Sequence, residues 1–207
     1  MFGGVQRDVA LQDAIPLRDA LEVDVARLPP GPVDSPFLIV LTGLPGTGKT
    51  HFAGELQKRL FLRVLESDRL RKLLVPHPEY TAVESARLFA ACHLLIEEYL
   101  VQGRPVLFDA TNLTEQFRQP LYLIARRTSA PLVLLRFTAP QEIVRQRLAE
   151  RAAGMHTDGH SDAGWLIYSR MYPHEEAISR QHLTVDSSKD ISAALDKVVQ
   201  RFGPAAV

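Results

Sequence analysis

One short glycine-rich stretch of the chain has residue types that could bind a polyphosphate. Residues 43–50 read Gly-Leu-Pro-Gly-Thr-Gly-Lys-Thr and directly follow the apolar run 37–41. The glycines permit backbone conformations that point successive N–H groups, and the positive end of a following helix, at phosphate oxygens. In such a pattern Lys49 reaches the β- and γ-phosphates of a nucleotide and Thr50 holds Mg²⁺. The stretch therefore predicts ATP, or alternatively GTP, together with Mg²⁺ as cofactors.

The same stretch also has a plainer interpretation, a glycine-rich turn that binds nothing. Pro45 and three glycines are a poor beginning for a helix unless a ligand occupies the loop, which favours nucleotide binding. The residues predicted to contact the nucleotide here are Gly43, Leu44, Pro45, Gly46, Thr47, Gly48, Lys49, Thr50 and His51.

A carboxylate and a guanidinium follow the second predicted strand, in the run Ser67-Asp68-Arg69-Leu70-Arg71. Asp68 would accept the proton of an acceptor hydroxyl. Arg71, three residues further along a helix, would share its face and hold an anionic group of the acceptor. An equally weighted alternative makes Ser67 or Asp68 a helix N-cap and leaves Arg71 solvated.

A second carboxylate, Asp109, ends the buried apolar run 105–108. An acid at the tip of such a strand is the usual second half of a phosphate-loop site, where it orders Mg²⁺ or its water shell. Thr50 and Asp109 are therefore the predicted metal ligands, and a simple strand-end turn acid is the alternative. Ala110 stands where motor-type ATPases place a glutamate that activates water, so the sequence favours transfer to an acceptor over hydrolysis.

Two arginines, Arg147 and Arg151, lie four residues apart and hence on one face of a predicted helix. Val144 and Leu148 form an adjoining apolar stripe. Guanidiniums on a movable helix would close over the nucleotide and neutralise charge that builds up on the transferred group. An ordinary solvated helix face is the alternative.

The segment 154–163 is polar and loose, as expected of a lid hinge. Alternate positions in it carry possible metal ligands, namely His156, Asp158, His160 and Asp162. Because no second cluster supports a metal site, a flexible lid loop explains the composition better. Trp165, Tyr168 and Tyr172 follow at helical spacing, which favours packing under the lid over stacking on a base.

Short apolar runs alternate with longer amphipathic stretches, so these residues belong to a parallel sheet with helices on both faces. The predicted strands are 37–42, 63–66, 105–109, 132–137 and 182–186. The predicted helices are about 48–60, 69–74, 82–102, 115–128, 140–153, 162–172 and 190–201. Open parallel sheets bind ligands beyond the carboxyl ends of their strands, where the polar residues above are expected to meet.

An additional helix is predicted before this core, over residues 16–28, with Pro16 in its first turn. Its apolar stripe consists of Leu17, Leu21, Val25 and Leu28. A stiff connection would follow, because it contains Pro29, Pro30, Pro32 and Pro36. We therefore expect an N-terminal part, 1–36, and a nucleotide domain, 37–203, with a lid at about 140–172.

Composition narrows the class of protein. The 207 residues are 46% hydrophobic and 23% charged, enough for one domain with a substantial core. Lys plus Arg equals Asp plus Glu at 24 each, so charge does not favour a nucleic-acid partner. The single cysteine, Cys92, fits a buried position in a reducing compartment, and neither a membrane span nor a secretory signal is recognisable. We expect a cytoplasmic protein.

The chain resembles the polynucleotide-kinase-like and zeta-toxin-like branch of P-loop kinases. Four features in chain order carry this resemblance: the glycine loop, the 67–71 run, Asp109 with the residues that follow it, and the arginine pair. The resemblance covers roughly residues 37–201. It implies an α/β three-layer sandwich of the P-loop NTPase type, with a five-stranded parallel sheet and a helical lid. It further implies Lys49, Asp68, Arg71, Arg147 and Arg151 in catalytic roles, and Asp186 and Ser187 near the adenine.

The expected function is an ATP-dependent kinase that moves the γ-phosphate to a hydroxyl of a small molecule or of a nucleic-acid 5′ end. The alternative is a nucleotide-binding switch or slow ATPase that acts on a protein partner through the N-terminal helix. Fold similarity alone does not choose between acceptors.

Overall fold

Five short apolar runs form one parallel sheet. The computed structural model describes residues 4–22, 33, 35–154 and 164–203. The strands are β1 (Leu38–Thr42), β2 (Arg63–Glu66), β3 (Val106–Asp109), β4 (Leu132–Thr138) and β5 (Leu183–Asp186). Their order is β2-β3-β1-β4-β5, and every neighbouring pair is parallel. The predicted five-stranded parallel sheet is confirmed.

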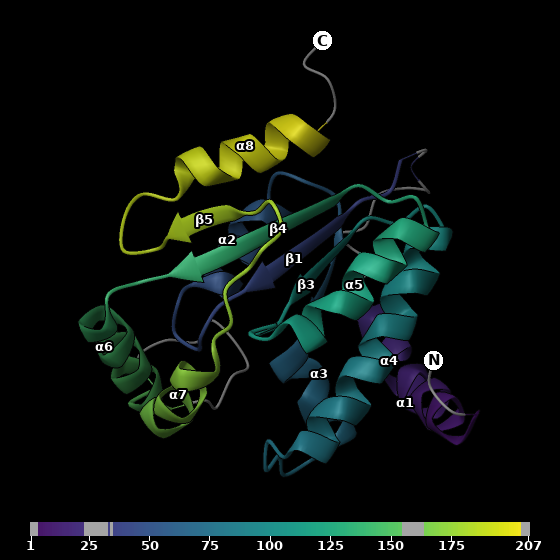
Figure 1. Ribbon diagram of the computed structural model, residues 1–207, viewed down its shortest axis with the longest axis horizontal. Helices are drawn as coiled ribbons and strands as arrows, with labels where there is room; N and C mark the ends of the chain where they lie inside the picture. The colour runs from purple at the N-terminus through teal and green to yellow at the C-terminus, as the bar shows by residue number, and fades with distance from the viewer. Residues whose placement is uncertain (1–3, 23–32, 34, 155–163, 204–207) are drawn as a thin grey trace.

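Helices lie on both sides of this sheet (Figure 1). They are α1 (Gly4–Glu22), α2 (Lys49–Gln57), α3 (Ser67–Leu74), α4 (Ala82–Val101), α5 (Glu115–Arg127), α6 (Gln141–Ala152), α7 (Trp165–Met171), the 3₁₀ turn η2 (Tyr172–His174) and α8 (Ser192–Phe202). No helix in the described ranges combines the length and apolarity needed to cross a bilayer.

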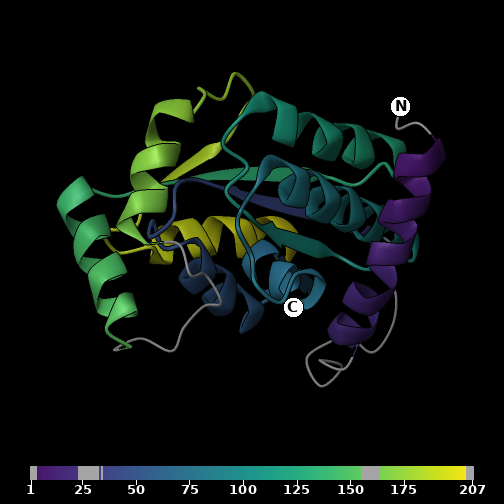
Figure 2. The ribbon, with the colours of Figure 1, turned by 90° about the horizontal axis from the view of Figure 1, so that it is seen from below.

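Alternation along the central strand builds two separate cores. Leu38 and Val40 point into a core shared with α1, α3, α4 and α5, whereas Ile39 and Leu41 point into a core shared with α2 and α8. Both faces of the sheet are buried at β1 and β3, so these two strands are mostly continuous apolar runs. Figure 2 shows the resulting layers, with α6 and α7 at one end of the molecule and α1 at the other.

The N-terminal helix differs from its prediction. Helix α1 begins at Gly4 and Pro16 lies inside it, not in its first turn. Leu17 and Leu21 are buried as predicted, while residues 23–32 lie outside the described residues, so the end of the predicted stripe is not described. Helix α1 packs on α4 and α3, and Asp13 accepts two hydrogen bonds from Arg87 of α4, at 2.6 and 2.9 Å. The division into 1–36 and 37–203 stays a prediction.

The lid helices share a small core of their own. Tyr168 of α7 is buried with Val144 and Leu148 of α6, and Trp165 stacks on its ring with centroids 4.9 Å apart. Packing under the lid is therefore confirmed for Tyr168, whereas Tyr172 is exposed. Residues 155–163 of the predicted hinge 154–163, which include its histidine and aspartate residues, lie outside the described residues.

Helix α4 buries two titratable side chains against the sheet. Burial raises the pKa of the Cys92 thiol to about 12, in agreement with the predicted core position. Burial also lowers the pKa of His93 to about 4, and its Nε2 makes no hydrogen bond. The His93 ring packs against the aromatic rings of Phe89 and Phe108, with centroids at 6.1 and 6.3 Å. His93 is therefore a neutral part of the core near neutral pH.

The substitution His93→Leu is expected to change how stability depends on pH. The pKa of His93 is 6.5 in the unfolded chain and about 4 in the folded protein, so between these values the unfolded chain binds more protons. The stability that depends on neutral His93 is complete above pH 6.5 and is lost as the pH falls through about 4. At about pH 4.5 the loss amounts to about 2 to 3 kcal/mol.

Urea unfolding of both proteins at about pH 7.5 and about pH 4.5 measures this effect. Between the two pH values, the free energy of unfolding of the variant minus that of the native protein should change by about 2 to 3 kcal/mol, in favour of the variant at the lower pH. A difference that stays constant with pH would contradict the assignment of a neutral, buried histidine.

Candidate active site

The predicted phosphate loop connects β1 to the first residue of α2. Gly46 and Gly48 have positive φ angles of 78° and 85°, a region that residues with a Cβ rarely enter. A Cβ on Gly46 would lie 2.9 Å from Val144 Cγ1, and one on Gly48 would lie 3.0 Å from Ser187 Oγ. These two positions require glycine, both for the backbone path and because the lid and the turn after β5 approach so closely.

The amino end of α2 faces this loop. Its first internal hydrogen bond runs from the N–H of Phe52 to the carbonyl of Gly48, at 3.1 Å. The N–H groups before Phe52 have no acceptor within the helix, and the positive end of the helix dipole lies beside them. This arrangement is the usual structural basis of phosphate binding at a helix end.

Lys49 and Thr50 begin α2 and bond to different groups. Lys49 Nζ donates to the carbonyls of Gly43 and Leu44, at 2.9 and 3.0 Å, and burial lowers its pKa. Thr50 Oγ1 donates to Asp109 Oδ2 at 2.7 Å. The lysine ammonium thus lies folded back on the loop, where phosphate oxygens could take the place of the two carbonyls.

Asp109 has the most strongly shifted pKa among the carboxyl groups of this site. Burial raises its pKa to about 6, against the opposing effects of the Lys49 charge and the Thr50 hydrogen bond. Glu66 is its partner in the β2–β3 register and adds negative charge that raises the pKa further. Glu66 was not among the predicted site residues, because only the order of the strands brings it beside Asp109.

The pair Thr50–Asp109 fits a magnesium ion. Hydroxyl and carboxylate oxygens are hard ligands, and Mg²⁺ commonly takes few protein ligands together with waters and substrate phosphates. Among the described residues there is no cluster of three or more histidine, cysteine or acidic side chains that could hold a metal by itself. The donor set therefore suits an ion that arrives with a nucleotide.

A cavity of about 290 Å³ brings most of the predicted residues together. It is lined by Pro45, Gly46, Gly48, Lys49, Thr50, His51, Glu66, Ser67, Asp68, Asp109, Ala110, Thr111, Arg147 and Arg151. The predicted residues that do not line it are Gly43, Leu44, Thr47, Arg71, Asp186 and Ser187. Three carboxylates, the loop lysine and two lid arginines therefore share one space.

Asp68 lines this cavity from the first turn of α3. The helix begins at Ser67, with Glu66 at the N-cap position and no side-chain capping bond. The alternative in which Ser67 or Asp68 caps the helix is therefore wrong. The carboxylate of Asp68 stands on the same side of the loop as Asp109, because β2 and β3 end at the same edge of the sheet.

Arg71 is buried, so the alternative of a solvated side chain is also wrong. Its Nη2 donates to Ser85 Oγ at 3.3 Å, its Nη1 lies 3.5 Å from Glu84 Oε2, and its guanidinium covers the Tyr80 ring at 4.8 Å. Its Nε makes no hydrogen bond. Arg71 is thus held between α3 and α4, beside the cavity and outside its lining.

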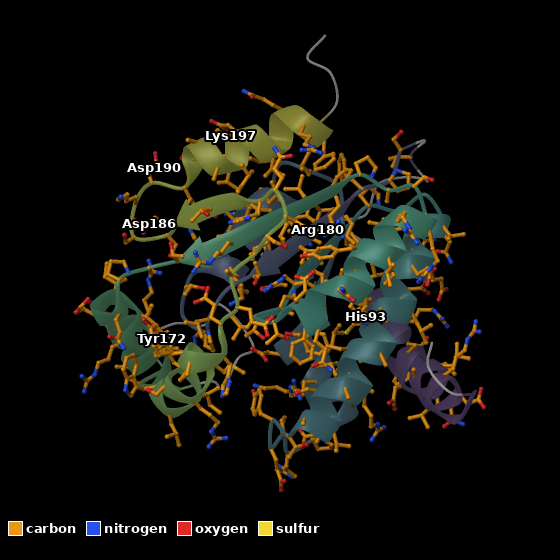
Figure 3. All side chains as sticks on the ribbon, viewed as in Figure 1. His93, Tyr172, Arg180, Asp186, Asp190 and Lys197 are labelled. Atoms are coloured by element: carbon orange, nitrogen blue, oxygen red, sulfur yellow. The ribbon has the colours of Figure 1, made fainter. Side chains whose placement is uncertain are left out.

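Arg147 joins three parts of the site. Its Nη1 donates to Ser187 Oγ at 2.8 Å and to the Gly46 carbonyl at 3.3 Å, and its Nη2 donates to the Ser187 carbonyl at 2.8 Å. Asp186, at the tip of β5 (Figure 3), instead accepts hydrogen bonds from Ser188, which lower its pKa. Of the two residues predicted near the adenine, Ser187 is the one that contacts the lid arginine.

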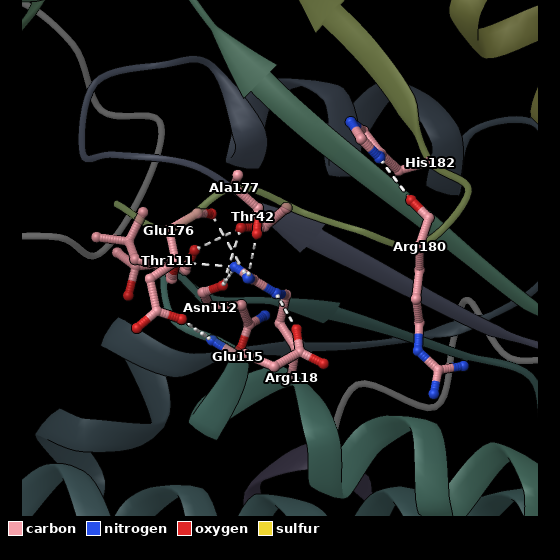
Figure 4. A network of polar contacts seen from close by, with 10 residues as sticks. Thr42, Thr111, Asn112, Glu115, Arg118, Glu176, Ala177, Arg180 and His182 are labelled. Carbon is pink, nitrogen blue, oxygen red and sulfur yellow. Dashed lines mark hydrogen bonds and ion pairs between the residues drawn. The ribbon is translucent and has the colours of Figure 1, made fainter. Parts of the chain in front are cut away.

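A fully buried arginine connects the loop after β3 to the segment after the lid. Arg118 donates to the carbonyls of Asn112 and Leu113 at 3.0 and 2.8 Å, and to those of Glu176 and Ala177 at 3.5 and 3.3 Å (Figure 4). Sequence analysis did not identify this residue, since an arginine on a helix usually faces solvent. These hydrogen bonds join the loop that follows Asp109 to residues 176–177, which follow the lid helices.

A glycine loop between the central strand and a helix, an acid at the next strand tip and a helical lid define a P-loop kinase-like protein. The chain belongs to the AAA domain family, which matches residues 38–164. The mouse "Protein KTI12 homolog" is 28% identical over 133 residues, which are 62% of this chain and 38% of that protein. The chain thus matches less than two thirds of this relative's length.

Solved structures show the same fold at low sequence identity. Kti12 of Chaetomium thermophilum in complex with ADP-AlF3 has a TM-score of 0.62 and 20% identity, covering 81% of this chain and 100% of that one. The APS kinase CysC of Mycobacterium tuberculosis, in complex with AMPPNP and APS, has a TM-score of 0.58 and 17% identity, covering 83% and 97%. A gluconokinase from Sinorhizobium meliloti 1021 has a TM-score of 0.56 and 18% identity, covering 80% and 95%. The narrower resemblance to polynucleotide kinases and zeta toxins stays a prediction.

Proposed function

We propose that the protein is an ATP-dependent phosphotransferase that moves the γ-phosphate of ATP to a hydroxyl acceptor. The observation that carries the proposal is the cavity in which the glycine loop, Lys49, Asp68, Asp109 and the lid arginines meet. Structural neighbours that are named as kinases, one of them in complex with AMPPNP, support it through the fold.

The proposed reaction is an in-line displacement at the γ-phosphorus. The acceptor oxygen forms a bond to phosphorus, the bond from phosphorus to the bridging oxygen of ADP breaks, and the hydroxyl proton passes to the Asp68 carboxylate. Lys49, released from the carbonyls of Gly43 and Leu44, would bind the transferred group. Arg147 and Arg151, which line the same cavity, would stabilise the charge spreading over its oxygens.

Thr50 and Asp109 would hold Mg²⁺, which supplies charge neutralisation on the β- and γ-phosphate oxygens when bound. Asp109 would serve this role as a carboxylate, the form that predominates at neutral pH when the pKa is about 6. A cation held there would favour that ionised form further, because an opposite charge lowers a carboxyl pKa.

The acceptor would lie on the side of α3 and α4. Arg71 lies beside the cavity, with an Nε that makes no hydrogen bond and a guanidinium over Tyr80, and we expect it to receive an anionic group of the acceptor. Ser85 and Glu84 keep the side chain in place meanwhile. A phosphorylated or carboxylated acceptor fits this arrangement best.

Phosphate transfer from labelled ATP tests the proposal directly. We expect calorimetric binding of ATP, or of GTP, with Mg²⁺, and label uptake by one member of a panel of nucleosides, sugars, antibiotics and 5′-hydroxyl oligonucleotides. Lys49→Met should abolish transfer, because the ammonium would no longer meet the γ-phosphate. An absence of heat with both nucleotides would overturn nucleotide binding itself.

A second candidate is a nucleotide-dependent switch or slow ATPase that acts on a protein partner. It is favoured by the KTI12 homolog of mouse, and by the Chaetomium Kti12 structure with ADP-AlF3. Helix α1 exposes Leu11 and Ile15, one turn apart, and it packs on α3, the helix that carries Asp68. If ADP forms from ATP at the same slow rate with and without each acceptor in the panel, the result would favour the switch.

A further inference from the structure

A second cavity, of about 520 Å³, lies at the far edge of the sheet, away from the nucleotide loop. It is lined by Tyr122, Leu132, Val133, Leu134, Arg180, Gln181, His182, Leu183, Lys197, Val198 and Arg201. Its floor is apolar, and no acidic side chain belongs to this lining. None of these residues has a role in the proposed phosphoryl transfer.

The cavity exists because β4 is longer than its outer neighbour. On the inner side β1 pairs with β4 from Leu132 onward, but on the outer side β5 pairs only from Leu135, opposite Leu183. Figure 1 shows the amino-terminal half of β4 extending past β5. The carbonyl of Pro131 accepts from the N–H of Leu38 on β1, and main-chain groups of alternate residues point to opposite sides of a strand. The outward groups of Leu132 therefore face the cavity, and no strand of the described chain pairs with them. Such an edge can accept another strand.

Cationic side chains from helix α8 and from the segment before β5 flank this open edge. Lys197 and Arg201 are exposed and four residues apart on α8, so they share one face. Arg180 lies on the segment that leads into β5, with its guanidinium 4.1 Å from the centre of the Tyr122 ring. Figure 3 shows Arg180 and Lys197 on different elements around the strand. Within the described ranges, no carboxylate forms an ion pair with any of these three residues.

We propose that this cleft binds an extended acidic peptide segment of a partner protein, which adds as a short strand along β4. The main-chain groups of β4 would supply hydrogen bonds, the apolar floor would accept alternate side chains, and the cations would pair with the acidic ones. A polynucleotide would use the cations and leave the open strand edge without partners, so a peptide matches more of the cleft. The site lies apart from the phosphate loop and stands independently of the proposed function.

Fluorescence anisotropy with a fluorescein-labelled peptide of alternating valine and glutamate tests this proposal. We expect saturable binding that weakens as salt rises, because exposed charges are screened. The double variant Lys197→Glu/Arg201→Glu should weaken binding by about tenfold or more through like-charge repulsion. Arg7→Glu, an exposed charge reversal on α1, is the control that should leave binding unchanged. Lys49→Met should also bind the peptide normally, which separates this site from phosphoryl transfer.

A backbone-methylated version of the same peptide distinguishes strand pairing from simple charge attraction. It keeps the carboxylates and lacks the amide donors, so it should bind at least tenfold more weakly. Equal binding of both peptides, no binding of either, or an unchanged affinity in the double variant would each overturn the proposal. An oligothymidylate that binds more tightly than the peptide, and loses affinity in the double variant, would assign the cleft to nucleic acid instead. Thermal melting of each variant verifies that it is folded.

Discussion

The substitution Asp68→Asn is expected to lower the rate of phosphoryl transfer by about 10² to 10⁴, while the affinity for nucleotide stays nearly unchanged. Asp68 lies at the cavity on the first turn of α3, where its carboxylate would take the acceptor proton. Asparagine keeps the shape and removes the basic oxygen. The expected loss corresponds to about 3 to 5 kcal/mol of activation free energy. Single-turnover transfer from labelled ATP, together with calorimetry of ATP binding, measures the two effects separately.

Glu66→Gln is the matched control for this variant. Glu66 lines the same cavity. Its substitution removes the same negative charge from the last residue of β2, two residues before Asp68. A general electrostatic effect would slow both variants alike, whereas a proton acceptor would make Asp68→Asn much slower than Glu66→Gln. An unchanged rate of Asp68→Asn with the true acceptor would remove this residue from the mechanism.

The substitution Arg118→Met is expected to lower the free energy of unfolding by about 3 to 5 kcal/mol. The side chain is fully buried and donates to four carbonyls, those of Asn112, Leu113, Glu176 and Ala177. Methionine fills similar space without donors, so acceptors that are buried in the native protein lose their partners. Urea unfolding followed by far-ultraviolet circular dichroism measures the loss.

Arg126→Met is the control on the same helix. Arg126 is exposed in the last turn of α5, and its replacement should change stability by no more than about 0.5 kcal/mol. If both variants unfolded at the same urea concentration, the hydrogen bonds of Arg118 in Figure 4 would contribute little to the stability of the protein.

The sheet could be predicted because its central strands β1 and β3 are short, mostly apolar runs that are buried along their whole length. The runs at 37–42, 63–66 and 105–109 match β1, β2 and β3 within a residue. The order β2-β3-β1-β4-β5 was not accessible, since it depends on contacts between strands that are distant in the chain. Glu66 was missed as a site residue for that reason.

Rules based on local sequence gave wrong interpretations at Pro16 and at Arg71. Proline is favoured in a first turn, but Pro16 lies within α1, which is already formed from Gly4 and buries Leu17 and Leu21 beside it. Tertiary packing therefore outweighs the missing N–H of this proline. Arg71 could not be recognised as buried, because the residues that cover it come from a later loop and helix, Tyr80, Glu84 and Ser85.

The functional loop was recognisable because its chemistry is contiguous. Glycines, lysine and threonine follow one another between a strand and a helix, and the structure gives them the expected path. Asp109 could be singled out for the same site, since an acid at the end of a central strand has few other reasons to be buried, but its hydrogen bond with Thr50 was not predicted. The contact of Arg147 with Ser187 depends on how α6 sits over the loop, which no sequence pattern encodes.

The burial of Cys92 leaves the outside of the described molecule without a thiol, because this is the one cysteine in the chain. A dye attached through maleimide chemistry would therefore go only to a cysteine introduced on purpose. Ser169→Cys, at an exposed position of α7, would place such a label on the lid without altering the native thiol. Opening and closing of the lid on ATP could then be followed optically, one molecule at a time.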